Sequence, residues 1–419
     1  MSETDLKNNN EYKETKLGWI PKSWTVQPVG FVVEKLIAGV SVNSTDEVAD
    51  SGEMGVLKTS CVYGGRFQPE QNKLVLASEH NRVKTRLYSN TILISRMNTP
   101  ELVGENAYVP KDYKHLFLPD RLWMTKFKEK AKLDVKWLSY AFQSHYFKSK
   151  TKRLATGTSN SMKNITKSDV LSIKLAYPPL EEQQKIASIL STWDIAIEKT
   201  LQLIEKKQQL KKGLMQQLLT GKKRLENYKN TWKTALIGDL LEESRIQTSE
   251  SDPNRRLKVR LKVKGIEKRE FRGTESKDST TFYVRKAGQF VYGKQNLHKG
   301  AAGIIPEELD GYESSQDIPA FDFTDKVNPK WFLLFISRES FYKRLENIST
   351  GTGSKRIHPK DLFKVKIPLP SIVEQNAIAE VLTKMENEIN LLDEELKNLQ
   401  SQKKGLMQQL LTGKVRIKF

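Results

Sequence analysis

Two stretches of the chain carry apolar residues at helical spacing, each over about forty residues. In the first stretch, from about residue 181 to Gly221, isoleucine, leucine and tryptophan recur at steps of three and four positions. In the second stretch the steps alternate regularly between four and three, through Ile378, Leu382, Met385, Ile389, Leu392, Leu396 and Leu399. A heptad pattern of this length is typical of a coiled-coil seam rather than of one face of a globular domain. The two stripes therefore predict two long helices that pack on each other in antiparallel orientation.

The residues at the ends of these stretches indicate where the helices start and stop. Prolines at 178–179, 368 and 370 hold the preceding backbone extended. Ser371 followed by Glu374 has the form of a capping box, so the second helix is expected to begin there. Gly221 and Gly413 stand where a helix C-terminus needs a left-handed residue. At a rise of 1.5 Å per residue, each helix is expected to be roughly 60 Å long.

The segments in front of the helices have a different pattern, with short apolar runs separated by Gly, Asn and Pro. Strands are expected at Thr91–Ser95, Phe282–Val284, Phe290–Tyr292 and 364–367, and amphipathic helices at 136–154 and 329–345. Each segment is therefore predicted to be a mixed α+β domain. The expected organisation is a polar N-terminal tail (1–16), a first domain (17–179), a first long helix (180–225), a second domain (226–370), and a second long helix with a C-terminal tail (371–419).

The chain is an internal duplication. The twelve residues 211–222, KKGLMQQLLTGK, recur unchanged as 403–414, an offset of 192 positions (211 to 403). Glu182 matches Glu374 at the same offset, and Trp137 matches Trp331 at 194. Outside such islands the halves differ strongly. A repeat of this kind indicates one scaffold used twice, carrying two divergent faces.

The repeat also indicates how the chain closes. After its first copy the chain continues to WKTALIG at 232–238, whereas after the second copy it stops at Phe419. A similar segment, WTVQPVG, lies near the other end at 24–30. We therefore expect the two termini to meet, giving a closed ring of two units related by a pseudo-two-fold axis.

The charge balance indicates a polyanionic partner. Lys and Arg number 70 against 50 Asp and Glu, a formal net charge of +20, and clustered cations bind phosphates with release of counterions. A basic surface without such a partner is the alternative. The single cysteine, Cys61, excludes an internal disulfide and a cysteine-based zinc site, which suits a reducing compartment. Residues 1–16 are polar, and the longest apolar run, 331–336, is too short to cross a bilayer. The expectation is a soluble cytoplasmic protein with no membrane partner.

The order of domain, long helix, domain and long helix, with nearly identical helix ends, resembles the specificity subunit of type I restriction–modification enzymes. The most specific motifs are LGWIPKSW at 17–24, PPLEEQ at 178–183 and the doubled KGLMQQLLTGK. The resemblance implies two target recognition domains that each read one half of a split, asymmetric site in double-stranded DNA. It also implies helices that set the half-site separation and dock two methyltransferase subunits, with two restriction subunits joining the complex. This chain would be non-catalytic and bind no cofactor, and S-adenosylmethionine, ATP and Mg would belong to the partner subunits.

Two corresponding loops are the leading candidates for DNA contact. Their candidate residues are Thr156, Gly157, Thr158, Ser159 and Lys163 in the first half, and Thr350, Gly351, Thr352, Ser354, Lys355 and Arg356 in the second. Small hydroxyl residues and glycine expose backbone N–H groups to phosphate, and the Lys and Arg add charge. A plain turn before a helix is the alternative. Nucleotide binding is rejected because the G-x-x-x-x-G-K spacing is absent.

Five further polar residues follow predicted strands at corresponding places, namely Arg96 and Asn98 in the first half and Lys294, Gln295 and Asn296 in the second. Arg, Asn and Gln are the side chains best able to make bidentate contacts with guanine or adenine edges. These residues are therefore candidates for base recognition. Ordinary solvated positions at strand ends are the alternative.

Catalytic alternatives have weaker support. Asp120, Asp134 and Lys136 have the outline of a metal-nuclease site, but Asn328 stands where the second half would repeat Asp134. No Asn-Pro-Pro-Tyr tetrapeptide of a methyltransferase is present. The sequence thus predicts a non-enzymatic DNA-recognition subunit, with a stand-alone DNA-binding coiled-coil adaptor or a metal-dependent nuclease as alternatives.

Overall fold

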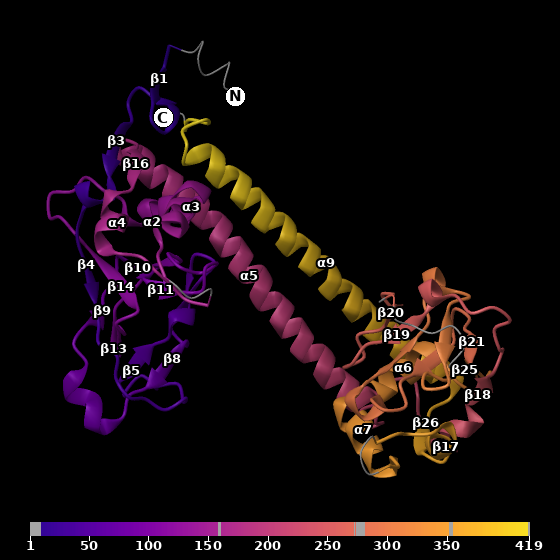
Figure 1. Cartoon of the computed structure of the whole chain (residues 1–419). Coiled ribbons are helices and arrows are strands. Elements are labelled where there is room, and N and C mark those ends of the chain that lie inside the picture. The colour runs from indigo at the N-terminus through magenta and orange to yellow at the C-terminus, as the bar shows by residue number, and fades with distance from the viewer. Residues whose placement is uncertain (1–9, 158–160, 272, 274–280, 352–354, 418–419) are drawn as a thin grey trace. The chain divides into compact units, whose positions relative to one another are not determined.

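The computed structural model describes residues 10–157, 161–271, 273, 281–351 and 355–417 (Figure 1). The chain divides into two compact units, the first made of Met1–Lys199 with Leu396–Phe419 and the second of Thr200–Glu395. Each unit therefore contains one domain, the first part of one long helix and the last part of the other. This composition is what a duplicated chain closed into a ring requires.

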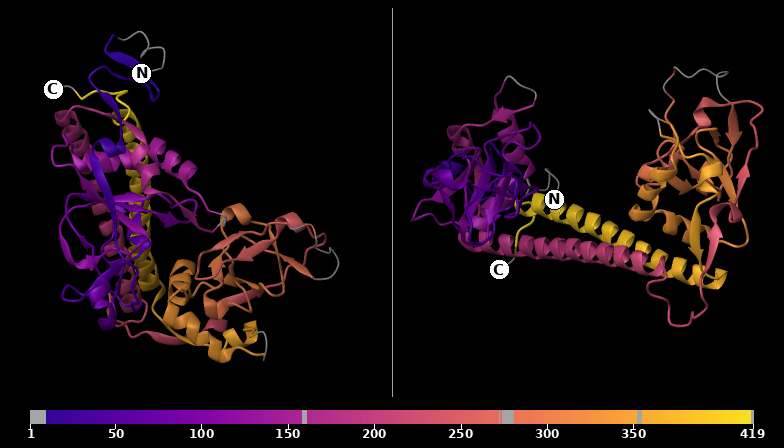
Figure 2. Two further views of the ribbon diagram at one scale, coloured as in Figure 1. Left: turned by 60° about the vertical axis from the view of Figure 1, so that its left-hand side comes forward. Right: turned by 90° about the horizontal axis from the view of Figure 1, so that it is seen from below.

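The two long helices are α5 (Leu180–Leu218) and α9 (Ile372–Leu410), each of 39 residues and therefore about 58 Å long. Figure 2 shows both as unbroken ribbons. In the first unit, Ile186 and Leu190 near the start of α5 share a core with Leu410 at the end of α9. In the second unit, Leu218 at the end of α5 shares a core with Leu382 near the start of α9. The predicted antiparallel pairing is confirmed in each unit.

An ion pair between the helices repeats with the same offset. Lys403 donates to Asp194 in the first unit at 2.5 Å, and Lys211 pairs with Glu386 in the second. The second unit adds a pair between Lys207 and Glu388, also at 2.5 Å. The helix pairing is thus specified by charge as well as by the apolar seam.

The ends of the long helices agree with the sequence in two respects and correct it in one. Gly221 and Gly413 have φ of +71° and +70°, the left-handed conformation expected after a helix C-terminus. Helix α9 begins at the expected place, and Glu374 N–H donates to Ser371 Oγ at 3.4 Å. Only this half of the predicted capping box forms, because the Glu374 carboxylate bonds Arg224 and Trp232 instead.

Both domains are built on the same four-stranded antiparallel sheet. In the first domain the order is β12 (Asn106–Val109), β10 (Thr91–Ser95), β14 (Leu122–Phe127) and β4 (Val33–Ala38). In the second it is β23 (Ala302–Ile304), β22 (Phe290–Tyr292), β25 (Ala320–Phe323) and β18 (Leu241–Ser244). The two domains therefore share one topology despite their divergent sequences.

The remaining sheets differ between the domains. The first domain has a mixed sheet in the order β8 (Asn72–Leu74), β5 (Gly55–Leu57), β13 (Tyr113–Phe117) and β9 (Arg86–Leu87), and a hairpin of β6 (Val62–Tyr63) and β7 (Arg66–Phe67). The second domain has the pairs β19 (Leu257–Val259) with β20 (Ile266–Lys268), and β21 (Phe282–Val284) with β24 (Glu313–Ser315). The common sheet is the scaffold, and these additions are where the two halves diverge.

Each predicted amphipathic helix is split in two. The first consists of α2 (Val135–Gln143) and α3 (His145–Leu154), and the second of α6 (Pro329–Ile336) and α7 (Glu339–Arg344). Ser144 has a ψ of 151° and its Oγ accepts from Phe147 N–H, so it ends one helix and caps the next. Arg338, with a ψ of 124°, makes the corresponding break. Two shorter helices follow the candidate loops, α4 (Lys167–Ser172) and α8 (Pro359–Leu362).

Three of the expected strands have the predicted bounds, and the fourth is shifted. Strands β10, β21 and β22 are confirmed. The strand expected at 364–367 is β26 (Lys366–Leu369), because Val365 N–H closes a turn on Leu362 at the end of α8. Strand β26 pairs with β17 (Lys233–Leu236), and in the first unit β16 (Lys174–Tyr177) pairs in the same way with β3 (Thr25–Pro28).

A buried glutamate joins the helix ends to the domain in both units. In the first unit, Glu182 is 1% exposed and accepts from Trp24 Nε1 at 3.0 Å and from Arg416 at 2.8 and 3.1 Å. In the second, Glu374 accepts from Trp232 Nε1 at 2.9 Å and from Arg224 at 2.5 and 2.7 Å. The segment that contains Trp24 thus has the same relation to the end of α9 as the segment that contains Trp232 has to the end of α5. This equivalence confirms the circular arrangement.

The glutamine that follows each buried glutamate connects the long helix to the start of a domain helix, which is α2 in the first unit and α6 in the second. Gln183 accepts from Asp134 N–H at 2.9 Å and donates to Pro178 O at 2.9 Å. Gln375 repeats both bonds, with Asn328 N–H at 2.8 Å and Pro370 O at 2.9 Å. The orientation of the domain on the helix is therefore set in the same way in each unit.

The expected polar tail of residues 1–16 contains a strand. Strand β1 (Tyr12–Thr15) pairs with β2 (Gly18–Pro21), and the Tyr12 hydroxyl donates to Gly413 O at 2.8 Å. Tyr12 is ordered because its ring is buried against the end of α9, and this burial raises the pKa of its hydroxyl. The two ends of the described chain are therefore neighbours.

Cys61 is fully buried, and burial raises the pKa of its thiol, so it is a core residue. Within the described part of the chain, no helix combines the length and the apolar composition needed to cross a membrane.

Candidate nucleic-acid interface

The first candidate loop is joined to the end of a central strand. Strand β11 (Met97–Asn98) pairs antiparallel with β15 (Lys163–Asn164), which sets Asn98 opposite Lys163. Thr156 exchanges both backbone hydrogen bonds with Asn164, each at 2.8 Å, so the loop closes on itself. The structure therefore brings together five residues predicted at separate places, Arg96, Asn98, Thr156, Gly157 and Lys163.

Gly157 is required by the geometry of this loop. Its φ is +146°, and a Cβ there would lie 2.7 Å from Met162 O. Lys163 Nζ donates to Gly157 O at 2.7 Å, which places the ammonium group at the neck of the loop. The Lys163 ammonium group therefore lies beside the exposed residues Thr156 and Gly157.

The two polar residues of the strand end are held in place by their own neighbours. Arg96 Nε donates to Asn164 Oδ1 at 3.2 Å, and its Nη1 donates to Asp120 O at 3.4 Å. Asn98 Oδ1 accepts from Thr99 N–H at 2.9 Å. Positioned side chains of this kind suit base recognition, because little rotamer freedom is lost on binding.

The second candidate loop has the same frame. Thr350 exchanges backbone hydrogen bonds with Arg356, each at 2.8 Å, and Ile357 N–H donates to Lys294 O at 2.9 Å. In the first unit Ile165 N–H donates to Arg96 O in the same way, at 3.1 Å. Lys294 therefore corresponds to Arg96, and its half-buried ammonium group has a pKa lowered by desolvation.

The charges of the second loop are paired with surface carboxylates. Lys355 donates to Glu346 at 2.6 Å and thereby lowers the pKa of that carboxyl, and Arg356 lies 3.7 Å from Asp317. Exposed pairs of this kind contribute little stability, so a phosphate can replace the carboxylate. Gly351 at the loop neck has a φ of +102°.

The remaining candidates have different outcomes. Asn296 lies in the tight turn that begins the 3-10 helix η6 (Leu297–Lys299), and no hydrogen bond among the described residues joins it to the 350–356 loop. Thr158, Ser159, Thr352 and Ser354 lie outside the described residues.

The carboxylates of the nuclease alternative have structural roles at separate places. Asp134 caps α2, accepting from Trp137 N–H at 2.7 Å, and Asn328 caps α6 by the same bond to Trp331 at 2.8 Å. Asp120 accepts a hydrogen bond from Ser41. The substitution of Asn for Asp is neutral for capping, which explains why the acidic residue is not repeated.

Known proteins share both the sequence pattern and the fold. A family model described as the type I restriction modification DNA specificity domain matches residues 21–212 and again residues 229–401, one match for each half of the duplication. The chain belongs to the type I restriction–modification specificity subunits. Its two domains are accordingly DNA-binding target recognition domains.

Relatives and solved structures agree along the length of the chain. The putative type I restriction enzyme MjaX specificity subunit of Methanocaldococcus jannaschii is 26% identical over 97% of this chain and 97% of the relative. The MjaVIII specificity subunit of the same organism is 29% identical over 70% of this chain and 74% of the relative. The crystal structure of the type I S subunit from M. genitalium has a TM-score of 0.56 at 16% identity, covering 96% of this chain and 97% of that one. At this identity the structural likeness concerns the fold alone.

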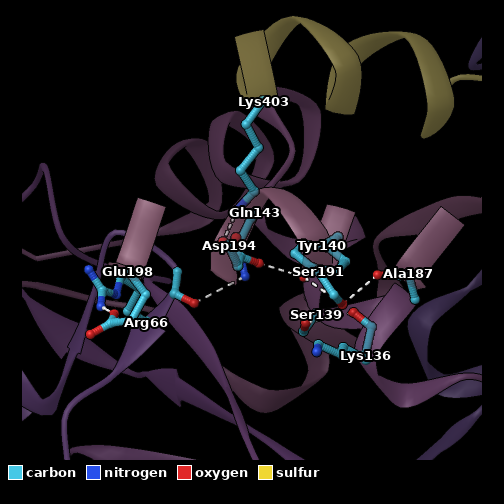
Figure 3. Close-up of polar contacts among 11 residues, drawn as sticks. Arg66, Lys136, Ser139, Tyr140, Gln143, Ala187, Ser191, Asp194, Glu198 and Lys403 are labelled. Atoms are coloured by element: carbon cyan, nitrogen blue, oxygen red, sulfur yellow. Dashed lines mark hydrogen bonds and ion pairs between the residues drawn. The ribbon is translucent and has the colours of Figure 1, made fainter. Parts of the chain in front are cut away.

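A polar network anchors the first target recognition domain to the long helices. Figure 3 shows Asp194 of α5 between Tyr140 of α2 and Lys403 of α9. Tyr140 donates to Asp194 Oδ2 and Lys403 to Asp194 Oδ1, both at 2.5 Å. Burial, aided by the charge of Asp194, raises the pKa of the Tyr140 hydroxyl. Arg66 adds an ion pair with Glu198 on α5.

The network borders a groove that the sequence analysis missed. The groove has a volume of about 1470 Å³ and is lined by β2, α3 and the last part of α9, all within the first unit. Its cations on α3 include Lys148, Lys152 and Arg153. A local signal was present, because α3 (HYFKSKTKRL) contains four Lys or Arg residues and no acidic residue. The facing cations on α9 could not be assigned to the same groove from the sequence.

Proposed function

We propose that this specificity subunit recognises a bipartite, asymmetric target in double-stranded DNA, with one target recognition domain on each half-site. The observation that supports the proposal is that both domains have the same backbone hydrogen bonds around the loop but different side chains at the equivalent position. Arg96 and Lys294 occupy the same position beside a loop closed by the same backbone bonds, yet the two side chains differ. Equivalent positions carrying different side chains suit two different half-sites.

The loops and the strand-end residues have separate roles in this proposal. Hydroxyl, glycine and lysine groups of the loops bind phosphate and set the register of each domain on the duplex. Arg96 and Lys294 are the residues placed to reach base edges, with Asn98 and Asn296 as further candidates. The chain itself is non-catalytic, and it acts in the cytoplasm together with its partner subunits.

The long helices would recruit two identical methyltransferase subunits. The exposed glutamines of the repeat are the candidates for this surface, Gln216 and Gln217 in the first copy and Gln408 and Gln409 in the second. Two identical surfaces suit two copies of one partner. The methyltransferase subunits would carry S-adenosylmethionine, and two restriction subunits would carry ATP and Mg, so this chain needs no cofactor.

The methylated motifs of the host strain test the proposal directly. Deleting the gene is expected to remove methylation at one interrupted motif. An unchanged set of methylated motifs would favour a DNA-binding coiled-coil adaptor instead. Methylation or cleavage of DNA by the purified chain alone would favour an enzyme.

Single substitutions test which domain reads which half-site. Arg96→Ala is expected to relax recognition in one half of the motif, and Lys294→Ala in the other half. The loss of a bidentate base contact corresponds to about 1–3 kcal/mol of discrimination. Each variant is the control for the other, because each is expected to leave the opposite half unchanged. Relaxation of both halves by one variant would contradict the assignment.

A further inference from the structure

The groove of the first unit is too large for an ordinary small-molecule site. Its volume of about 1470 Å³ exceeds the roughly 300–1,000 Å³ typical of ligand pockets. Helix α3 forms one wall, and the last part of α9 with the turn after it forms the other, from Gln400 to Lys414. Such a groove suits a segment of a macromolecule.

The lining of the groove is strongly cationic. Seven lysine and arginine residues line it, Arg66, Lys148, Lys152, Arg153, Lys403, Lys404 and Lys414, against the single carboxylate of Asp194. Three of the seven are paired within the protein, Arg66 with Glu198, Lys148 with Glu105 and Lys403 with Asp194.

The other four cations are available to a ligand. Lys152, Arg153, Lys404 and Lys414 are exposed, and none of them has an ion pair within the described residues. Two stand on each wall, so a polyanion in the groove would meet positive charge from both sides.

The second unit lacks this charge at the equivalent place. Residues 339–348, in α7 and the following turn, carry Glu339 and Glu346 against Lys343 and Arg344. Lys212 is the repeat of Lys404. The pKa of Glu339 is lowered mainly by its bond to Lys343, with a smaller contribution from Lys212. The surroundings of the two lysines therefore differ, because Lys404 lines a groove with the cations of α3, whereas Lys212 contributes to the electrostatics of a carboxylate on α7.

This difference between the units indicates the kind of occupant. A surface for the methyltransferase subunits is expected in both units, because two identical partners need two equivalent surfaces. The cationic wall of α3 is present in one unit only, and it leads directly into the candidate DNA loop that begins at Thr156. The two methyltransferase subunits are identical, whereas the two DNA half-sites differ. A positively charged wall that is present in one unit only, and that lies beside a candidate DNA loop, therefore suits DNA rather than a methyltransferase subunit.

We propose that this groove binds the sugar–phosphate backbone beside the half-site read by the first domain, through Lys152 and Arg153 on α3, Lys404 on α9 and Lys414 in the turn after α9. The inference rests on the proposed recognition of DNA. The apolar floor, which includes Met407 and Leu411, fits the deoxyribose faces, while the rims hold the phosphates. The contact carries no base information, so it adds affinity to target and unrelated DNA alike.

Two double variants of the full-length chain in complex with its methyltransferase partner test the proposal, Lys152→Gln/Arg153→Gln and Lys404→Gln/Lys414→Gln. The matched control is Lys212→Gln/Lys222→Gln, which alters the same two lysines in the other copy of the repeat. Dissociation constants are measured between 50 and 200 mM salt for a target duplex and an unrelated duplex. Unchanged thermal unfolding checks that these exposed substitutions leave the fold intact.

Each groove variant is expected to reduce the slope of log K against log salt concentration by about 1.8 on both duplexes, since each phosphate contact contributes about 0.9. The control is expected to keep the wild-type slope. Groove variants with the wild-type slope would overturn the inference, and so would a loss of methyltransferase binding with the DNA slope unchanged. If the wild-type complex binds no DNA, the proposed function fails and this inference with it. If Arg96→Ala weakens target binding while the groove variants do not, only the inference fails.

Discussion

At the scale of single residues, Glu182 and Glu374 are buried carboxylates held by several hydrogen bonds. Each is 1% exposed and accepts hydrogen bonds from one tryptophan and one arginine. A buried carboxylate is stable only when its oxygens are bonded and its charge is balanced. These residues therefore hold the helix ends to the domains rather than taking part in DNA recognition.

Glu182→Gln and Glu374→Gln are each expected to lower the free energy of unfolding by about 3 kcal/mol, because each leaves a partly buried arginine without its partner. Urea denaturation of the full-length chain measures the loss. Glu181→Gln is the matched control, since its side chain is exposed beside Glu182 and its substitution is expected to change stability by less than about 0.5 kcal/mol. Equal stability of the Glu181 and Glu182 variants would contradict the assigned role.

At the scale of elements, the two long helices have equal lengths of 39 residues and repeat the same interhelical ion pair. Equal length is necessary in an antiparallel pair whose ends must both meet a domain. Under the proposed function, the helices also determine the number of base pairs between the half-sites.

Removing one heptad from both helices, residues 200–206 and 392–398, is expected to shorten the unspecified spacer of the target by about three base pairs. Seven residues rise about 10.5 Å, and one base pair occupies about 3.4 Å. Sequencing the methylated motifs of a strain carrying the shortened protein measures the spacer. The control removes the seven residues from α5 alone, which leaves seams of unequal length and is expected to abolish methylation. A folded double deletion with the original spacer would show that helix length does not set the distance.

At the scale of the whole molecule, the chain is closed into a ring by side-chain contacts. Tyr12 donates to Gly413 O, and Trp24 shares the Glu182 carboxylate with Arg416. The same contacts recur in the second unit, where Arg224 and Trp232 share the Glu374 carboxylate within one continuous stretch of chain.

A circular permutant tests this equivalence. Joining residue 419 to residue 1 with a flexible linker and opening the chain between Tyr228 and Lys229 is expected to preserve folding and the methylated motif, because the junction is closed by the same contacts in both units. Thermal unfolding and methylation in vivo are the measurements. Opening the chain between Glu205 and Lys206, inside α5, is the comparison expected to fail. Loss of folding in the first permutant would show that the two junctions are not equivalent.

The interpretation from the sequence was reliable where the controlling interactions are local or repeated. The apolar stripe from Ile378 to Leu399 predicted α9, since a helix places such residues on one face whatever surrounds it. Gly221 and Gly413 predicted the helix ends from backbone conformation alone. The duplication predicted that the two domains share a scaffold, which the common sheet order confirms.

The sequence failed where contacts between distant segments override local preference. Glu374 has the spacing of a capping box, yet its carboxylate bonds Arg224, 150 residues away, because a buried charge is better satisfied by a cation than by a backbone N–H. The single helix expected at 136–154 is two helices, since Ser144 stabilises a break through its own cap.

By itself, then, the sequence determined the two long helices, the repeated scaffold and the positive charge, all of which follow from periodicity, identity and composition along the chain. Only the tertiary structure decided which separated residues meet. It joined Arg96 to the loop after Thr156 and placed Lys404 and Lys152 in the lining of one groove. The physical reason is that electrostatic and hydrogen-bonding partners are selected by distance in space, which the order of residues does not specify.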